Sequence, residues 1–296
     1  MSKTAMTKVF ITGKSGQVGR ELVERAAELK IDAVSFDSSE LDICDREKVI
    51  AAIAEHKPSV VINAAAYTAV DKAETEIDQA YAVNCDGVEN LALACKSQNI
   101  PLIHISTDYV FDGEKEAPYL ELDTPNPKGV YGASKYAGEQ VLRATWEKHI
   151  IVRVSWVFGR YGNNFVKTML HLAKDKDEIS VVNDQFGAPT STIDIARVLL
   201  NLSTVENIDF GLYHLESNPK VSWHGFAVKI FEEAKEIGLL EKIPVVKPIS
   251  SEHYPTPTKR PVNSKLATDK GLLPVNWPKA LSQILRDKAD FKACDK

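Results

Sequence analysis

The residues most able to do chemistry in this sequence are Tyr131 and Lys135, which stand four positions apart with only small residues between them. On a helix this spacing puts both side chains on one face, one turn apart. An ammonium group near a phenol favours the phenolate, so the tyrosine can give and take a proton near neutral pH. Because a tyrosine and a lysine meet at this spacing by chance in many proteins, the surrounding elements decide what the pair means.

A glycine-rich turn near the start of the chain predicts a dinucleotide site. Residues 13–19 read Gly-Lys-Ser-Gly-Gln-Val-Gly, between a β-branched strand at 8–12 and an amphipathic helical pattern. Glycines let the backbone turn sharply and approach a pyrophosphate, which a helix N-terminus attracts. A plain β–α turn is the alternative, but strand, turn and helix in succession favour the cofactor. The expected contacts are Gly13, Ser15, Gly16, Gln17, Val18 and Gly19.

The second predicted strand, at 33–36, leaves the choice of cofactor open. It ends at Asp37, where an acid would bond the adenosine ribose hydroxyls and favour NAD over NADP. Lys14, Ser38 and Ser39 could instead accept a ribose phosphate. We therefore expect NADH or NADPH.

Further cofactor contacts are expected at the carboxyl ends of strands, where ligands of parallel sheets bind. A third strand, at 59–63, runs into three alanines, whose short side chains leave room for a large ligand. The segment around Asp42 could flank the adenine or cap the helix that starts near Asp45. The residues predicted on these grounds are Asp42, Ile43, Ala64, Ala65 and Ala66.

Strands alternate with helices through the first half of the chain, which predicts an α/β fold with a Rossmann-type, doubly wound parallel sheet. A fourth strand at 101–106 ends at Thr107, and a fifth lies at 150–154. We expect residues 1–159 to form the NAD(P)-binding domain. Beyond them the rhythm changes, so residues 160–296 are expected to form mainly a smaller α/β substrate lobe whose segments interleave with the first domain.

Composition excludes several other classes. The 296 residues are 44% hydrophobic and 26% charged with a net charge of −5, and no basic stripe marks a nucleic-acid surface. No apolar run is long enough for a membrane span or a signal peptide. Seven scattered histidines and four cysteines without C-x-x-C spacing indicate reduced thiols in a cytoplasmic protein, with no zinc site. These cysteines are Cys44, Cys85, Cys95 and Cys294.

Several longer runs carry a resemblance that covers nearly the whole chain. They are residues 13–19, 63–74, 106–111, 131–135, 153–157, 162–170, 183–190 and 259–261. In these runs the sequence resembles the extended short-chain dehydrogenase/reductase superfamily and, within it, is most similar to the dTDP-4-dehydrorhamnose reductase family. The runs at 63–74 and 183–190 are far more specific than the glycine turn or the Tyr–Lys pair.

The resemblance implies NAD(P)H-dependent reduction of the C4 ketone of dTDP-4-dehydro-L-rhamnose to dTDP-L-rhamnose, a step of cell-surface polysaccharide biosynthesis. Tyr131 would give the proton, and Lys135 would hold the nicotinamide ribose and lower the pKa of the tyrosine. Thr107 would hydrogen-bond the ketone oxygen, where charge builds. The substrate contacts that it implies are Thr107, Asp108, Tyr109, Tyr131, Trp156, Asn164, Gln185 and Arg260. Core packing is the alternative for Trp156, and a surface role for the last three.

The resemblance also bears on metal and assembly. Relatives with a magnesium-bridged dimer use three glutamates, of which Glu21 matches the first. The second position falls at 191–193, which holds no carboxylate, and Asp287 matches the third only loosely. We therefore expect no magnesium site, and a monomer or a weak homodimer.

Four alternative functions share this fold. A sugar-nucleotide dehydratase would place an Asp-Glu pair after the threonine, but here Tyr109 follows Asp108, and a tyrosine cannot do the carboxylate's proton work. An epimerase, or another sugar-nucleotide reductase, needs only the cofactor and the Tyr–Lys pair, and the family-specific runs argue against it. A non-catalytic subunit, like the partner of methionine adenosyltransferase, would have no chemical need to keep Thr107, Tyr131 and Lys135 together.

Overall fold

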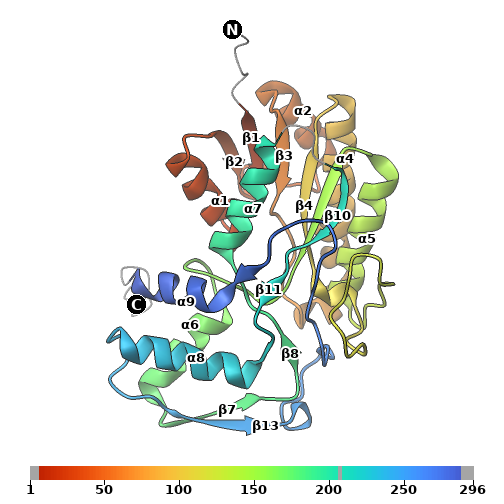
Figure 1. Ribbon diagram of the computed structural model, residues 1–296. Helices are drawn as coiled ribbons and strands as arrows, with labels where there is room; N and C mark the ends of the chain where they lie inside the picture. The colour runs from red at the N-terminus through yellow and green to blue at the C-terminus, as the bar shows by residue number, and fades with distance from the viewer. Residues whose placement is uncertain (1–6, 206–208, 288–296) are drawn as a thin grey trace.

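A six-stranded parallel sheet forms the centre of the protein (Figure 1). The computed structural model describes residues 7–205 and 209–287, so Cys294 lies outside the described residues. The strand order is β10-β5-β4-β3-β1-β2. Their bounds are β1 Lys8–Thr12, β2 Asp32–Phe36, β3 Val60–Asn63, β4 Leu102–Thr107, β5 His149–Val154 and β10 Gly211–His214. The predicted α/β fold with a doubly wound parallel sheet is confirmed.

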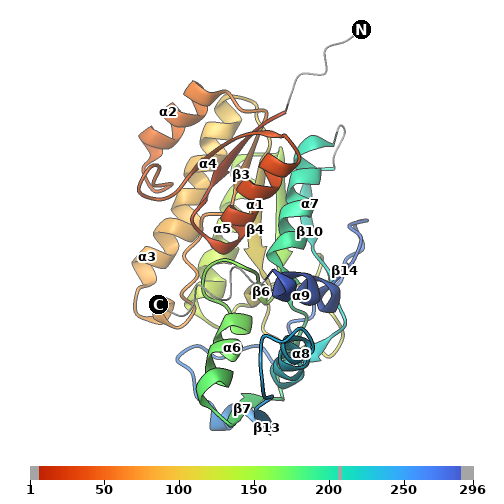
Figure 2. The ribbon, with the colours of Figure 1, turned by 90° about the vertical axis from the view of Figure 1, so that its left-hand side faces the viewer.

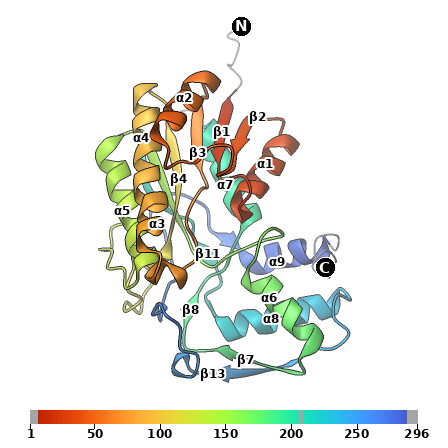
Figure 3. The same ribbon diagram turned by 180° about the vertical axis from the view of Figure 1, so that it is seen from behind.

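Helices cover both faces of this sheet (Figures 1 and 3). One face packs against α1 (Gln17–Glu28) and α7 (Thr192–Thr204), and the other against α2 (Arg46–His56), α4 (Gly87–Ser97) and α5 (Val130–Thr145). Successive residues of β1 serve the two layers in turn, since Val9 and Ile11 belong to the first core and Phe10 to the second. Side chains of a strand alternate between its faces, so a buried parallel strand must be apolar throughout.

The single helix expected from residue 78 to 98 is interrupted. It consists of α3 (Ile77–Tyr81), a π-helical turn at Ala82–Asp86, and α4. Asn84 lies in the π turn, where its amide accepts from Tyr67 N at 2.9 Å and donates to Ser134 Oγ at 3.0 Å. This bracing role is the one the sequence indicates for Asn84. A Cβ at Gly138 would lie 2.0 Å from Asn84 O, so the π turn presses directly against α5.

A smaller lobe lies below the carboxyl ends of the strands (Figure 2). It contains α6 (Phe165–Asp175), α8 (Trp223–Glu236) and α9 (Trp277–Arg286), and β7 (Glu178–Val182) paired in parallel with β13 (Val245–Ile249). Phe226, Phe231 and Trp277 lie in its hydrophobic core. Short pairs link its loops: β6 Val157–Phe158 with β9 Thr190–Ser191, β8 Phe186–Gly187 with β12 Val221–Ser222, and β11 Ser217–Asn218 with β14 Val275–Asn276.

Two elements beyond residue 159 return to the large sheet. The strand β10 pairs with β5, and α7 packs beside α1. The division of the chain at residue 159 stays a prediction. It includes the expectation that segments of the second part join the first domain. Across residues 7–205 and 209–287, no helix is long and apolar enough to cross a membrane.

Candidate active site

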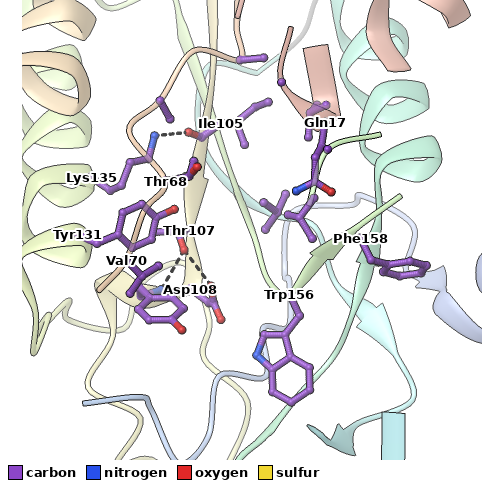
Figure 4. Close-up of a pocket in the computed structure, with 18 of the residues that line it drawn as sticks. Gln17, Thr68, Val70, Ile105, Thr107, Asp108, Tyr131, Lys135, Trp156 and Phe158 are labelled. Atoms are coloured by element: carbon purple, nitrogen blue, oxygen red, sulfur yellow. Dashed lines mark hydrogen bonds between the residues drawn. The ribbon is translucent and has the colours of Figure 1, made fainter. Parts of the chain in front are cut away.

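A cavity of about 570 Å³ opens where the strands of the large sheet end and the smaller lobe begins. The glycine turn, the alanines after β3, the end of β4 and helix α5 all contribute to its wall. Figure 4 shows Tyr131 and Lys135 projecting from one side and Trp156 from the other, with Thr107 and Asp108 between them. The chain thus brings the predicted catalytic residues together in one cavity.

The glycine turn forms a cradle that no larger residues would permit. Gly13 has a φ of +73°, and a Cβ there would lie 2.6 Å from Ala65 N. A Cβ on Gly19 would lie 2.0 Å from Gly13 O. Helix α1 begins here without a side-chain cap, and the strand order reverses between β1 and β3, where such sheets bind nucleotides. The cradle therefore fits the pyrophosphate of a dinucleotide.

The adenosine end of the cradle holds an ionised acid. Asp37 accepts hydrogen bonds from Ser39 Oγ at 2.6 Å and from Ser15 Oγ at 3.1 Å. These bonds, that of Ser39 foremost, lower the pKa of the Asp37 carboxyl. Lys14 Nζ lies 2.5 Å from Glu40 Oε1, so its charge is already compensated. The carboxylate can accept from ribose hydroxyls, whereas a ribose phosphate would have to compete with Glu40 for Lys14.

Asp42 and Ile43 lie away from the cavity wall. Asp42 Oδ1 accepts from Cys44 N at 2.9 Å and closes a turn, while Ile43 is buried in the core against α2 and α4. The residue that caps α2 is Asp45, which accepts from Lys48 N at 3.1 Å. Their contact with adenine stays a prediction.

The Tyr131–Lys135 pair lies on the face of α5 that meets the cavity. Lys135 Nζ donates to Ile105 O at 2.7 Å and lies 3.3 Å from His104 Nε2, and burial lowers its pKa to about 8. Burial raises the pKa of Tyr131 to about 12, partly offset by the hydroxyl of Thr107. The expected lowering of the tyrosine pKa by Lys135 is therefore absent, because the ammonium is directed at the Ile105 carbonyl. Tyr131 holds its proton at neutral pH.

Thr107 and Asp108 follow β4 and open a 3₁₀ turn, η3 (Asp108–Val110). Thr107 Oγ1 accepts from Tyr109 N at 3.2 Å and donates to Asp108 Oδ1 at 2.9 Å. Asp108 is 2% exposed, and its Oδ2 has no hydrogen-bond partner. Burial raises the pKa of this carboxyl to about 7.

A buried ion pair supports the catalytic helix from behind. Glu139, one turn after Lys135, accepts from Arg153 at 2.8 and 2.6 Å and from Ser106 Oγ at 2.5 Å. Its charge raises the pKa of Lys135 against the larger effect of burial. His104 Nδ1 accepts from Asn63 Nδ2 at 3.0 Å, as expected of a satisfied core histidine. Sequence reasoning missed Glu139, although an acid four residues after the lysine was a usable signal.

Aromatic side chains form the wall opposite the catalytic pair. Trp156 stacks on Trp223 with ring centroids 3.5 Å apart, and Phe165 lies 4.7 Å from Trp223. Trp156 thus both packs and lines the cavity, and it holds a left-handed φ of +46°. Trp223 and Phe165 were missed, because Trp223 reaches the site by stacking on Trp156 and Phe165 by packing against Trp223.

Two of these aromatic residues also line a second cavity of about 870 Å³ in the smaller lobe. Gln185 and Arg260 lie on its wall, as do Phe165 and Trp223, which border both cavities. Arg260 Nη2 lies 2.7 Å from Asp71 Oδ2. A long ligand could therefore extend from the catalytic pair past the aromatic wall into the second cavity.

Residues 6–289 match the family described as the RmlD substrate binding domain. The chain belongs to this family. It is 46% identical to the dTDP-4-dehydrorhamnose reductase of Aggregatibacter actinomycetemcomitans, over 94% of this chain and 98% of that one. It also resembles the crystal structure of the Bacillus anthracis dTDP-4-dehydrorhamnose reductase in complex with NADP, at 39% identity and a TM-score of 0.89, over 96% and 100% of the two chains. For the Clostridium acetobutylicum dTDP-4-dehydrorhamnose reductase, the identity is 40% and the TM-score 0.86, over 94% and 98%.

One residue that the family resemblance puts at the substrate has a structural role in this RmlD-family chain. Asn164 caps α6 by accepting from Lys167 N at 3.2 Å, and it donates to Gln17 Oε1 at 3.0 Å. Neither cavity has Asn164 on its wall, whereas its neighbour Asn163 lines the first. Its contact with substrate stays a prediction.

Glu21 and Asp287, which the resemblance compares with metal-bridging glutamates, lie around a guanidinium together with Glu24. Arg160 Nη2 lies 3.1 Å from Glu21 Oε1 and 2.7 Å from Glu24 Oε2, and Arg160 Nη1 lies 3.1 Å from Asp287 Oδ2. In the part of the chain that the structure describes, no group of three or more His, Cys, Asp or Glu could hold a metal ion. Arg160 thus supplies the positive charge between these acids.

Proposed function

We infer that this chain is an NAD(P)H-dependent reductase that converts the C4 ketone of dTDP-4-dehydro-L-rhamnose to the alcohol of dTDP-L-rhamnose. The observation that carries this function is the placement of a half-buried Tyr131 beside Thr107 and Lys135, between a glycine-rich cradle and a second cavity with room for a long ligand. The chain is 46% identical over nearly its whole length to a dTDP-4-dehydrorhamnose reductase.

The residues divide the reaction between them. When bound, the nicotinamide cofactor supplies a hydride to the ketone carbon. Tyr131 gives its proton to the ketone oxygen, which completes the alcohol, and later regains a proton from solvent. Thr107 hydrogen-bonds the same oxygen as charge develops on it. Lys135, held by the Ile105 carbonyl, lies where it can bond the ribose hydroxyls next to the nicotinamide.

The second cavity suits the nucleotide part of the substrate. Arg260 is a planar donor that can bind a diphosphate in a fork, and Gln185 can bond a base edge. Trp156 and Tyr109 border the first cavity and offer apolar surface to the sugar. Asn164 and Asp108 complete the proposed substrate contacts.

We propose that the enzyme works in the cytoplasm, since Cys44, Cys85 and Cys95 are all free thiols. We propose a monomer or weak homodimer, because Arg160 occupies the position between Glu21 and Asp287. The ionised Asp37 and the compensated Lys14 favour NADH in the choice between the two cofactors.

An absorbance assay distinguishes a reductase from an epimerase or a non-catalytic subunit. The purified protein is supplied with dTDP-4-dehydro-L-rhamnose and either NADH or NADPH, and the loss of nicotinamide absorbance is followed. We expect oxidation of cofactor in equal amount to the dTDP-L-rhamnose formed. An epimerase or a non-catalytic subunit would consume no reduced cofactor, so a folded, cofactor-binding protein that consumes none disproves the reductase.

A further inference from the structure

One carboxyl oxygen of Asp108, at the wall of the cavity, has no hydrogen-bond partner. Among the described residues, three buried side-chain polar atoms lack a partner, namely Asp108 Oδ2, Arg160 Nε and Thr192 Oγ1. Of these residues, Asp108 is the one that lines the catalytic cavity. A buried carboxylate oxygen without a partner costs far more than a neutral carbonyl oxygen in the same place. The geometry therefore favours a protonated carboxyl.

The hydrogen bond from Thr107 to Asp108 uses the same hydroxyl proton that the substrate ketone needs. A hydroxyl has one proton, and Thr107 Oγ1 at present donates it to Asp108 Oδ1 across 2.9 Å. Reduction needs that proton at the ketone oxygen of the substrate. An ionised Asp108 can only accept, so it competes with the substrate for Thr107. A protonated Asp108 can donate to Thr107 and removes the competition.

We propose that Asp108 acts as a neutral carboxylic acid that donates to Thr107 Oγ1 and so directs the Thr107 hydroxyl proton at the ketone oxygen of the substrate. Asp108 is then a positioning residue, because it acts through Thr107. This inference rests on the proposed reductase function of the same site. Asp108 and Thr107 keep their protons in this step, since Tyr131 supplies the proton that reaches the product.

The surroundings of Asp108 disfavour its charged form. Ser264 lies close enough to lower its pKa, but the Ser264 hydroxyl donates to Phe186 O at 3.3 Å. The Arg260 guanidinium, 6.0 Å from the ring centroid of the neighbouring Tyr109, is paired with Asp71. The titratable groups that share the cavity wall with Asp108 are Tyr109, Tyr131 and Lys135. Asp71 and Arg260 line the second cavity and act on the neighbouring Tyr109. Burial outweighs all of these and raises the pKa of Asp108 to about 7.

The test compares pH profiles of kcat. In wild type, protonated Asp108 is lost as pH rises through its pKa, so we expect kcat to fall on the alkaline side of neutrality. Asp108→Asn has an amide that donates to Thr107 at every pH, so its kcat should stay level through this window. Asp108→Ala should also stay level, but about tenfold below Asp108→Asn because one orienting hydrogen bond is gone. Asp32→Asn removes an exposed carboxylate on β2 and should keep the wild-type profile.

Lys135 is the other group that could titrate in this window, since its pKa is lowered to about 8. If Asp108→Asn keeps the wild-type alkaline decline, the decline belongs to Lys135 and the proposal is wrong. Equal kcat values for the Asn and Ala variants would overturn it as well. If wild type itself oxidises no cofactor, the reductase function has failed instead.

A double variant tests the route through Thr107. Thr107→Val should lower kcat by about 10²–10³, the usual effect of losing one donor to a developing oxyanion. Adding Asp108→Asn to Thr107→Val should then change neither kcat nor its pH profile, since there is no hydroxyl left to orient. An additional loss of tenfold or more would show that Asp108 acts by another route. These two variants suffice if Asp108→Ala does not fold.

Discussion

Burial raises the pKa of the Tyr131 phenol to about 12, so in the proposed reaction this residue starts with its proton in place. A reductase needs a proton donor at the ketone, and a phenol that is already ionised could not serve. The lysine one turn away is directed at the Ile105 carbonyl rather than at the phenol. In the proposed mechanism this ammonium is the group that would bond the nicotinamide ribose.

Replacing Tyr131 by Phe should lower kcat by about 10²–10⁴, the usual contribution of a positioned acid. Binding of the dinucleotide should change little, since the cradle and Lys135 are untouched. Kinetics followed by nicotinamide absorbance and cofactor titration by fluorescence measure the two effects. Tyr136→Phe is the matched control, because Tyr136 lies on the same helix but is absent from the cavity wall. A Tyr131→Phe enzyme within threefold of wild-type kcat would refute the acid assignment.

Helix α1 is joined to β1 by a turn in which two backbones nearly touch. A Cβ at Gly19 would lie 2.0 Å from Gly13 O, and the atoms involved are backbone, which cannot swing away. Gly19→Ala should therefore displace the cradle and weaken dinucleotide binding by about 10- to 100-fold, the equivalent of a steric cost of about 1–3 kcal/mol. Fluorescence titration with NADH and NADPH measures the loss.

Val23→Ala, on the exposed side of the same helix, should bind both cofactors as wild type does. Unchanged affinity in Gly19→Ala would mean that the pyrophosphate does not rest on this turn.

The strands of the large sheet were predictable because each buried parallel strand is an apolar run bounded by turn formers. The first five predicted strands agree with β1–β5 to within one or two residues at each end. The interruption between α3 and α4 was not predictable, since the π turn depends on contacts of Asn84 with Tyr67 and Ser134 that are distant in sequence. The two-residue strands of the smaller lobe depend on tertiary pairing in the same way.

The candidate site shows the same limit. Motif spacing and the strand-end rule placed Thr107, Tyr131 and the glycine turn. Trp223 reaches the cavity by stacking on Trp156, and no pattern in the neighbouring sequence predicts that contact. Asn164 stands directly before a helical pattern, a position that predicts a helix cap. In the structure it has this capping role.

At the scale of the molecule, Arg160 ties the two parts of the chain together. It follows β6 and reaches α1 through Glu21 and Glu24, and the end of α9 through Asp287. Two residues further on, Gly162 and its neighbour line the catalytic cavity. The ion pairs therefore hold a piece of the cavity wall against the helix whose N-terminus forms the cradle.

Arg160→Met should lower the free energy of unfolding by about 3 kcal/mol, because Glu21 is fully buried and would keep only Arg25 as a partner. Urea unfolding measures this change, and a raised KM for the dinucleotide should accompany it. Adding Glu21→Gln removes the stranded charge, so the double variant should regain part of the lost stability. Lys242→Met breaks an exposed ion pair with Asp177 and should cost less than about 1 kcal/mol. If Arg160→Met is no less stable than this control, or if the double variant is the least stable of all, Arg160 does not hold the two parts together.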